Sequence, residues 1–239
     1  MINVKDYVVL DFEMTGLSAK YHKIIEIGAV RVRDGQVRKT LELLINPKSP
    51  IPEKVVELTG ITDKMVRLHG IEEDVALQQL LDFIGEDIIV GQNINFDYGF
   101  LKQWEVNHKI KAVRKGCDTL KLARHLLPPA QPKKLECLCD YFGIDRVREH
   151  RALDDAMETA QVFEKLKGMA EGDAKLEALF EPKILSYHAK KQTPATANQI
   201  QRLKEYCSLH HITDEICFEN LTRSEASRTM DKYISLYGR

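Results

Sequence analysis

Residues 23–45, "KIIEIGAVRVRDGQVRKTLELLI", constrain the fold more than any other stretch of the chain. Two β-rich runs meet at Asp34-Gly35, and this dipeptide is the strongest short-range signal for a β-hairpin. A further apolar run, "YVVL" at residues 7–10, comes before them. The sequence therefore predicts that the chain begins with three strands in an antiparallel meander.

After this meander, strand and helix patterns alternate. "NPKSPIPEKVVELTGIT" is broken by three prolines and predicts a loop that encloses a short helix. "DIIVGQN" predicts a short buried strand. Apolar residues at helical spacing predict further helices over residues 72–84, 96–106, 118–127, 133–143 and 152–169. Strands in a meander, followed by strand and helix in alternation, indicate a mixed α/β sheet covered by helices.

The bulk composition excludes several classes of protein. Net charge is −1, so any contact with nucleic acid would need local basic patches instead of a general positive field. No apolar run reaches the length of a membrane span, so no membrane partner is expected. The five cysteines fit neither a disulfide framework nor a zinc site, which predicts idle thiols and a cytoplasmic location.

Beyond residue 172 the composition shifts, and two helical patterns follow. "TANQIQRLKEYC" and "TRSEASRTMDKYISLYG" each open with a capping box, formed by Thr196 with Gln199 and by Thr222 with Glu225. Whether this helical pair meets nucleic acid or docks a partner stays open. The predicted organisation is a first domain, a connecting segment and a small all-α module, at residues 1–172, 173–194 and 195–239.

The first strand ends in a pair of acids, Asp11 and Glu13. Residues i and i+2 of a strand point to the same face, so these carboxylates would lie side by side and repel each other. That arrangement is favourable only when something positive lies between them. The ordinary alternative is a strand end whose acids point into solvent.

A third acid, Asp97, follows the strand that ends at Gly91 and stands at the start of a helix. Asn93 or Asn95 could cap that helix. Asp97 could equally be a first-turn acid that the helix dipole favours.

The long C-terminal helix of the first domain opens with "EHRALDDAMETAQVF". Asp155 shares a helical face with apolar residues and is predicted to face the protein. Asp154 and Glu158 lie on a more polar stripe and are predicted to face water. His150 precedes this helix, and its ordinary alternative is an exposed loop histidine.

Taken together, the three motifs are far more specific than any one of them. Their order is D-x-E, then N-x-x-F-D-x-x-x-L, then H-x-A-x-x-D. With these motifs the chain resembles the DEDDh (DnaQ-like) group of 3′→5′ exonucleases, which includes the proofreading epsilon subunit and the PolC-type exonuclease domain of bacterial DNA polymerase III. Thr15-Gly16, "ELTGIT" and "DTLKLAR" support the likeness. The resemblance covers residues 6 to about 168, and it implies a ribonuclease-H-like fold.

The resemblance also implies a set of site residues. Two divalent ions, Mg²⁺ or Mn²⁺, would be held by four acids, and a histidine would accept a proton from the attacking water. A metal between Asp11 and Glu13 would explain why they stand together. The implied metal ligands are Asp11, Glu13, Asp97 and Asp155, the catalytic histidine is His150, and the candidate substrate contacts are Met14, Thr15, Gly16 and Phe100.

The implied function is a metal-dependent 3′→5′ exonuclease that releases nucleoside 5′-monophosphates from single-stranded DNA. Its partners would be nucleic acid with a free 3′ end and a DNA polymerase subunit. One departure is that Phe12 and Met14 stand where many members have threonine, and "EMTGL" is similar to oligoribonucleases. An exoribonuclease of the RNase T or oligoribonuclease kind therefore stays open, as does a non-catalytic module that binds nucleic acid or a polymerase.

Overall fold

The computed structural model describes residues 2, 4–213 and 216–238, so the outer limits of the predicted domains, residues 1 and 239, lie outside it. Its first three strands are β1 (Asp6–Met14), β2 (Ile24–Arg33) and β3 (Gln36–Leu44), and they pair antiparallel in sequence order. The turn between β2 and β3 has positive φ angles at Asp34 (48°) and Gly35 (71°), as a type I′ hairpin requires. The predicted meander is confirmed.

Three further strands complete a six-stranded mixed sheet of order β3-β2-β1-β4-β5-β6. β4 runs parallel to both β1 and β5, and β6 pairs antiparallel with β5. The predicted mixed sheet is confirmed, but β5 and β6 were not predicted because such short strands carry no periodicity of their own. The bounds are Ile88–Gly91 for β4, Lys115–Asp118 for β5 and Lys183–Ile184 for β6.

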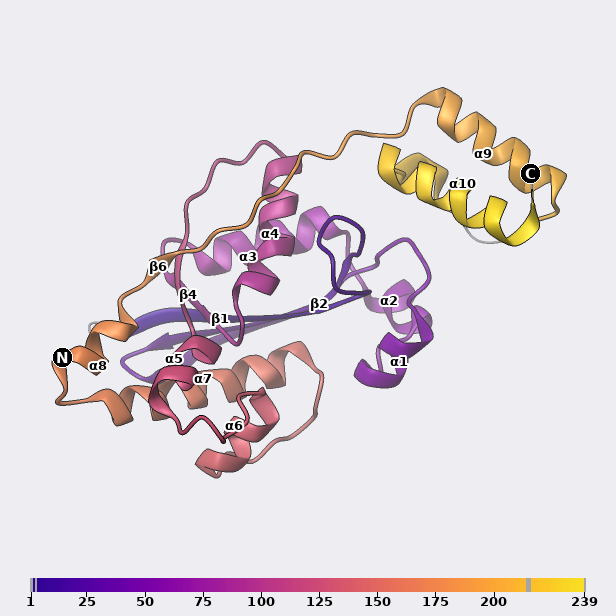
Figure 1. Cartoon of the computed structure of the whole chain (residues 1–239). Helices are drawn as coiled ribbons and strands as arrows, with labels where there is room; N and C mark the ends of the chain where they lie inside the picture. Colours follow the sequence, from indigo (N-terminus) through magenta and orange to yellow (C-terminus); the bar gives the residue numbers. More distant parts are fainter. Residues whose placement is uncertain (1, 3, 214–215, 239) are drawn as a thin grey trace.

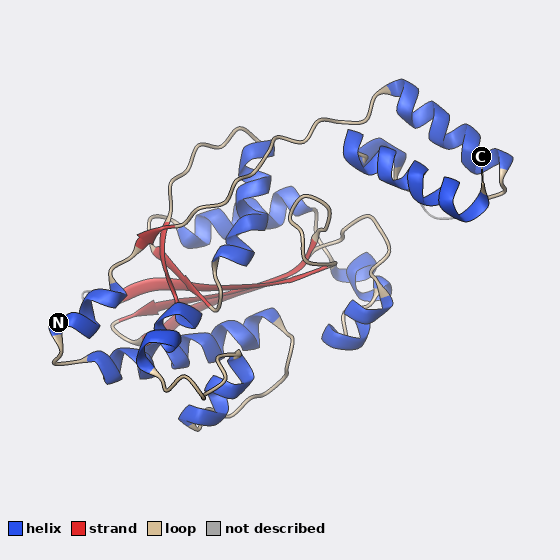
Figure 2. Ribbon diagram, viewed as in Figure 1, coloured by secondary structure: helices blue, strands red, loops and turns tan. Residues whose placement is uncertain are grey.

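Helices cover both faces of this sheet (Figures 1 and 2). α3 (Glu73–Ile84) and α4 (Asn95–Asn107) pack on one face, while α5 (Thr119–Leu126), α6 (Leu135–Phe142) and α7 (Ala152–Ala170) pack on the other. The remaining α-helices are α1 (Glu53–Thr59), α2 (Asp63–His69), α8 (Ala174–Glu177), α9 (Ala197–Leu209) and α10 (Arg223–Tyr237). The helix α2 was not predicted.

The pleat of β1 decides which way its acids point. Tyr7 and Val9 belong to the core cluster under α7, whereas Val8, Leu10 and Phe12 belong to the cluster under α3 and α4. Because side chains alternate along a strand, Asp11 and Glu13 continue the face that α7 covers. The last pair of the β1–β4 ladder is Val9 with Val90, so both acids lie beyond the end of that ladder.

The start of α7 lies directly on β2. A Cβ atom placed on Gly28 would come within 2.1 Å of the carbonyl carbon and oxygen of Ala152, the first residue of α7. Gly28 is also the register partner of Asp11. Glycine at this position therefore lets the helix begin one strand away from the paired acids.

The predicted asparagine cap of α4 is wrong. The N-cap residue is Ile94, and no side chain caps the helix there. Asn93 instead adopts a left-handed φ of 58°, and its carbonyl oxygen accepts the Phe96 amide at 2.9 Å. Asparagine tolerates this backbone conformation better than most residues, so it turns the chain without capping the helix.

The two C-terminal helices form a hairpin that stands beside the sheet at the end of an extended segment (Figure 1). Both predicted capping boxes are confirmed, and Leu203, Cys207 and Tyr233 pack in a small core between the helices. The hairpin reaches the rest of the chain where the Arg228 guanidinium lies 3.7 Å from the centre of the Tyr21 ring. The domain division at residues 172 and 194 stays a prediction. Within the described ranges, no helix combines the length and the apolar character needed to cross a membrane.

Candidate active site

Three of the predicted site acids meet at the far end of β1. Asp11 and Glu13 come from β1 itself, and Asp97 comes from the first turn of α4. The chain turns into α4 directly after β4, which places Asp97 beside the extension of β1. There the Asp97 carboxylate accepts the backbone amide of Phe12, the residue between the two β1 acids, at 3.0 Å.

The loop before α7 and the helix's first turn bring the other two predicted residues to the same place. One ligand atom each from Glu13, His150 and Asp155 lie within 4.8 Å of one another, a spacing that could hold a metal ion. His150 has a left-handed φ of 56° at the end of its loop. The structure thus brings all five residues together, while their catalytic and metal-binding roles stay predictions.

The charges of these acids act strongly on one another. Removal from water, together with the charges of Asp97, Asp155 and Glu13, raises the pKa of Asp11 well above its usual range. Burial and the Asp155 charge raise the pKa of Glu13 to about 8. Burial likewise raises the pKa of Asp97 to about 7 and that of Asp155 to about 6. A bound cation would offset the repulsion within this group of carboxylates.

Hard oxygen donors of this kind fit the predicted ions. Mg²⁺ and Mn²⁺ prefer carboxylate and water oxygens, and Mg²⁺ in particular uses few protein carboxylates. The donor set at the end of β1 and the start of α7 provides carboxylates with one imidazole beside them. The residues present therefore suit a divalent metal.

The predicted directions of the α7 acids are correct for Asp155 and wrong for Glu158. Asp155 is 7% exposed and faces the site, as predicted, while Asp154 pairs at 2.7 Å with the exposed Arg148. Glu158, predicted to face water, is 3% exposed. Arg146 explains this burial, because its guanidinium bonds Glu158 at 2.8 Å and Asp155 at 3.0 Å.

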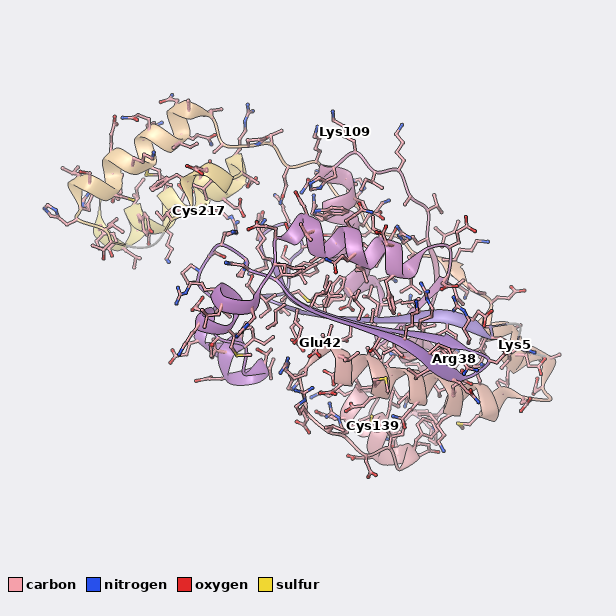
Figure 3. The ribbon with its side chains drawn as sticks, turned by 180° about the vertical axis from the view of Figure 1, so that it is seen from behind. Lys5, Arg38, Glu42, Lys109, Cys139 and Cys217 are labelled. Atoms are coloured by element: carbon pink, nitrogen blue, oxygen red, sulfur yellow. The ribbon has the colours of Figure 1, made fainter. Side chains whose placement is uncertain are left out.

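A second ion pair next to the site was not predicted from the sequence either. Glu26 on β2 is fully buried beside Glu13, its register partner, and it bonds Arg151. Arg151 reaches Glu42 on β3 as well, at 3.2 Å, and Glu42 is labelled in Figure 3. The available signal was a single acid inside the apolar run "IIEIGAV", since a charged residue is rarely buried without a partner.

Three of the four predicted substrate contacts, Met14, Thr15 and Gly16, directly follow the acids of β1 in the chain, and Phe100 lies on α4 three residues after Asp97. Thr15 closes that loop, because its amide donates to the Lys23 carbonyl and its hydroxyl accepts the Lys23 amide, both at 2.9 Å. A Cβ atom on Gly16 would lie 2.4 Å from the His22 ring. Met14 is partly buried, and Phe100 is only 5% exposed in the core under α3 and α4. Their contacts with substrate stay predictions.

Most of the chain matches a known protein family. The sequence model described as "Exonuclease" matches residues 8–163, more than half of the chain. The chain belongs to the exonuclease family. The predicted DnaQ-like relationship and the predicted 3′→5′ exonuclease enzyme are both confirmed at the level of the family.

Individual relatives agree with this assignment. The chain is 37% identical over 213 residues to a protein of Bacillus subtilis named DNA polymerase III PolC-type, a match that covers 86% of this chain and 14% of that relative. The chain spans only 11–14% of the length of the PolC-type relatives it matches.

Solved structures support the fold of the exonuclease. The nuclease domain of 3′hExo, named a DEDDh family member, matches with a TM-score of 0.61 and 20% identity over 78% of this chain and 98% of that chain. E. coli exonuclease I matches with a TM-score of 0.60 and 18% identity over 70% of this chain and 42% of that chain. Both likenesses confirm the ribonuclease-H-like sheet with its flanking helices.

The two adjacent acids of α7 should differ sharply in their effect on the exonuclease. Asp155→Ala should lose most of the nuclease rate, because the substitution removes a carboxylate that faces Glu13 and His150. Asp154→Ala should keep most of it, because that side chain pairs with Arg148 at the surface. The measurement is the initial rate of digestion of a short single-stranded oligonucleotide. An essential Asp154 beside a dispensable Asp155 would contradict the placement.

Metal should stabilise the exonuclease more at alkaline than at acidic pH. Glu13, Asp97 and Asp155 have folded-state pKa values of about 8, 7 and 6, above the unfolded values of about 4. Without metal, their contribution to stability is present below pH ~4 and is lost as the pH rises through 6 to 8. Added Mg²⁺ should raise the melting temperature most near pH 8, where the carboxylates are ionised. Thermal unfolding in EDTA and in MgCl₂ measures this, and an equal metal effect at pH ~5 and pH ~8 would contradict it.

Proposed function

We propose that the chain is a metal-dependent 3′→5′ exonuclease that removes nucleoside 5′-monophosphates from single-stranded DNA ends. The observation that carries the proposal is the convergence of Asp11, Glu13, Asp97, Asp155 and His150 at one place, from segments far apart in the sequence. Four mutually repelling carboxylates beside an imidazole have little structural use, and they suit phosphodiester hydrolysis well.

The acids would hold two divalent ions. Asp11, whose pKa is raised by burial and by the charges of the other three acids, would serve both ions, Glu13 and Asp155 would serve one, and Asp97 the other. Bound Mg²⁺ or Mn²⁺ supplies positive charge that stabilises the attacking and leaving oxygens of the displacement at phosphorus.

His150 would take the proton from the attacking water. Its loop position lets the imidazole approach the acids at the start of α7, and neutral imidazole is suited to this task near neutral pH. The backbone at Thr15 and Gly16, directly after β1, would approach the terminal nucleotide, while Met14 and Phe100 would contact its base.

Single-stranded DNA is the proposed substrate class. The B. subtilis relative is named as a DNA polymerase, and the E. coli exonuclease I structure is described in complex with a dT13 oligonucleotide. Association with a polymerase and action in the cytoplasm belong to the same proposal. An exoribonuclease is the second candidate, because the 3′hExo nuclease domain is described as bound to rAMP and "EMTGL" resembles oligoribonucleases.

The test is digestion of matched DNA and RNA oligonucleotides, linear and circular, in Mg²⁺, in Mn²⁺ and in excess EDTA. Linear single-stranded DNA should shorten from its 3′ end with release of 5′-monophosphates, and EDTA should abolish this. A 3′-terminal phosphate should block the reaction. Faster digestion of RNA would favour the second candidate, and cleavage of the circular strand would reject an exonuclease.

A further inference from the structure

Glu26 is a buried acid outside the proposed set of ligands. Its side chain on β2 is 0% exposed, and both oxygens of its carboxylate accept hydrogen bonds. Arg151 donates from Nε at 3.0 and 3.2 Å and from Nη2 at 2.6 Å, and the backbone amide of Ala152 donates at 2.9 Å. Both donors belong to the point where the loop carrying His150 becomes α7.

Stability alone gives no reason for this arrangement. Glu26 stands opposite Glu13 in the β1–β2 register, and like charges directly opposite each other destabilise a sheet. The Glu26 charge raises the pKa of both Asp11 and Glu13. A buried ion pair commonly contributes no more than well-packed apolar side chains of the same volume. An apolar residue at position 26 would avoid the repulsion.

The pair does fix where α7 begins. Among the described contacts, no side chain next to the start of the helix caps it. Instead, the Glu26 carboxylate on the underlying strand β2 accepts the first helical amide, that of Ala152. An anion at a helix N-terminus is also favoured by the helix dipole. Gly28, two residues along the same strand, leaves the space in which Ala152 rests. Glu26 and Gly28 thus fix where the first residue of α7 lies on β2.

Arg151 connects this anchor to both site residues of the segment. It follows His150 directly, so holding its side chain holds the loop on which the imidazole stands. Its carbonyl oxygen accepts the Asp155 amide at 3.0 Å, which closes the first turn of α7. Both His150 and Asp155 are therefore placed from one residue.

We propose that Glu26 is a positioning residue for the active site, acting through Arg151 and the Ala152 amide to set His150 and Asp155 against Asp11 and Glu13. In this role it would contact neither substrate nor the reacting phosphate. The inference rests on the proposed function, since it assigns Glu26 to the same site. Outer partners that orient metal-binding side chains typically change metal affinity or activity by about 10- to 100-fold when they are replaced.

The first variant is Glu26→Gln, which keeps the shape of the side chain and removes its charge. kcat on a short single-stranded oligonucleotide should fall by about 10- to 100-fold, while KM changes little. Calorimetric Mn²⁺ affinity should weaken in the same variant. Amide hydrogen exchange over residues 150–156 should accelerate, and this readout does not depend on activity or on metal.

Glu105→Gln is the matched control. Glu105 on α4 is also 0% exposed, and it bonds Arg114 at 3.0 and 3.1 Å and Lys102 at 3.1 Å. Within the described part of the chain, its carboxylate bonds none of the five candidate site residues. This variant also removes one charge from a buried ion pair, but it should keep kcat, Mn²⁺ affinity and exchange at residues 150–156.

Arg151→Lys is the second variant, in case Glu26→Gln does not fold. It keeps the positive charge and loses the planar pair of donors, so its kcat and Mn²⁺ affinity should fall between those of wild type and Arg151→Ala. Equal losses of kcat and Mn²⁺ affinity in the Glu26 and Glu105 variants would overturn the proposal. Unchanged kcat, Mn²⁺ affinity and exchange in Glu26→Gln would overturn it as well. Wild-type protein without metal-dependent nuclease activity would instead reject the proposed function, while exchange over residues 150–156 would still report on the anchor.

Discussion

Asp11→Asn should abolish most nuclease activity and yet raise the stability of the metal-free protein. The charges of Asp97, Asp155 and Glu13 all act on Asp11, so its loss removes the carboxylate on which the proposed metal site depends. We expect a rate loss of at least about 10²- to 10³-fold, the scale seen when one group that stabilises transition-state charge is removed. The same substitution relieves a buried charge repulsion, so the melting temperature in EDTA near pH 8 should increase.

The control for this variant is Asp6→Asn, at an exposed position on the same strand. It should alter neither the rate nor the melting temperature. The paired measurements are kcat in MgCl₂ and thermal unfolding in EDTA. A variant at Asp11 that loses both activity and metal-free stability would indicate a structural role for this acid in place of a catalytic one.

His150→Asn should lower the chemical step by about 10²-fold or more, the usual contribution of a general base. Asparagine is the informative replacement because it accepts the left-handed backbone conformation that His150 adopts, so the loop keeps its shape. Mn²⁺ affinity should survive, since the carboxylates remain. Free imidazole added to the reaction should restore part of the rate.

Single-turnover digestion and Mn²⁺ calorimetry measure these effects. His125→Asn, at an exposed position in the last turn of α5, is the matched control and should behave as wild type. A His150→Asn variant with near-wild-type turnover between pH ~6 and pH ~9 would assign the proton transfer to another group.

Much of the fold could be predicted because local signals and tertiary structure agree. The Asp34-Gly35 turn needs two left-handed residues, and the chain supplies residues that accept them. Both C-terminal capping boxes formed as their spacing predicted. β5 and β6 could not be predicted, because their four and two residues pair through neighbours that are distant in the sequence.

The candidate site shows the same division. The motifs singled out the five residues that the structure brings together, since spacing along one strand or one helix fixes which way a side chain points. Glu158 was assigned to the solvent side because helical spacing cannot show that Arg146, on a preceding loop, folds over that face. The roles of Glu26 and Arg151 were hidden for the same reason, as 125 positions separate the two partners in the chain.

The late position of α7 in the sequence has a consequence for the newly made chain. β1 and β2 leave the ribosome long before residues 152–170 exist to cover them. Throughout that interval, the apolar face of these strands is uncovered and can associate with other chains, a common route to aggregation. Asp11, Glu13 and Glu26 place three negative charges on this same face, and charges on an uncovered strand oppose such pairing. The acids that repel one another in the folded protein would thus oppose aggregation of the first strands until α7 has been synthesised.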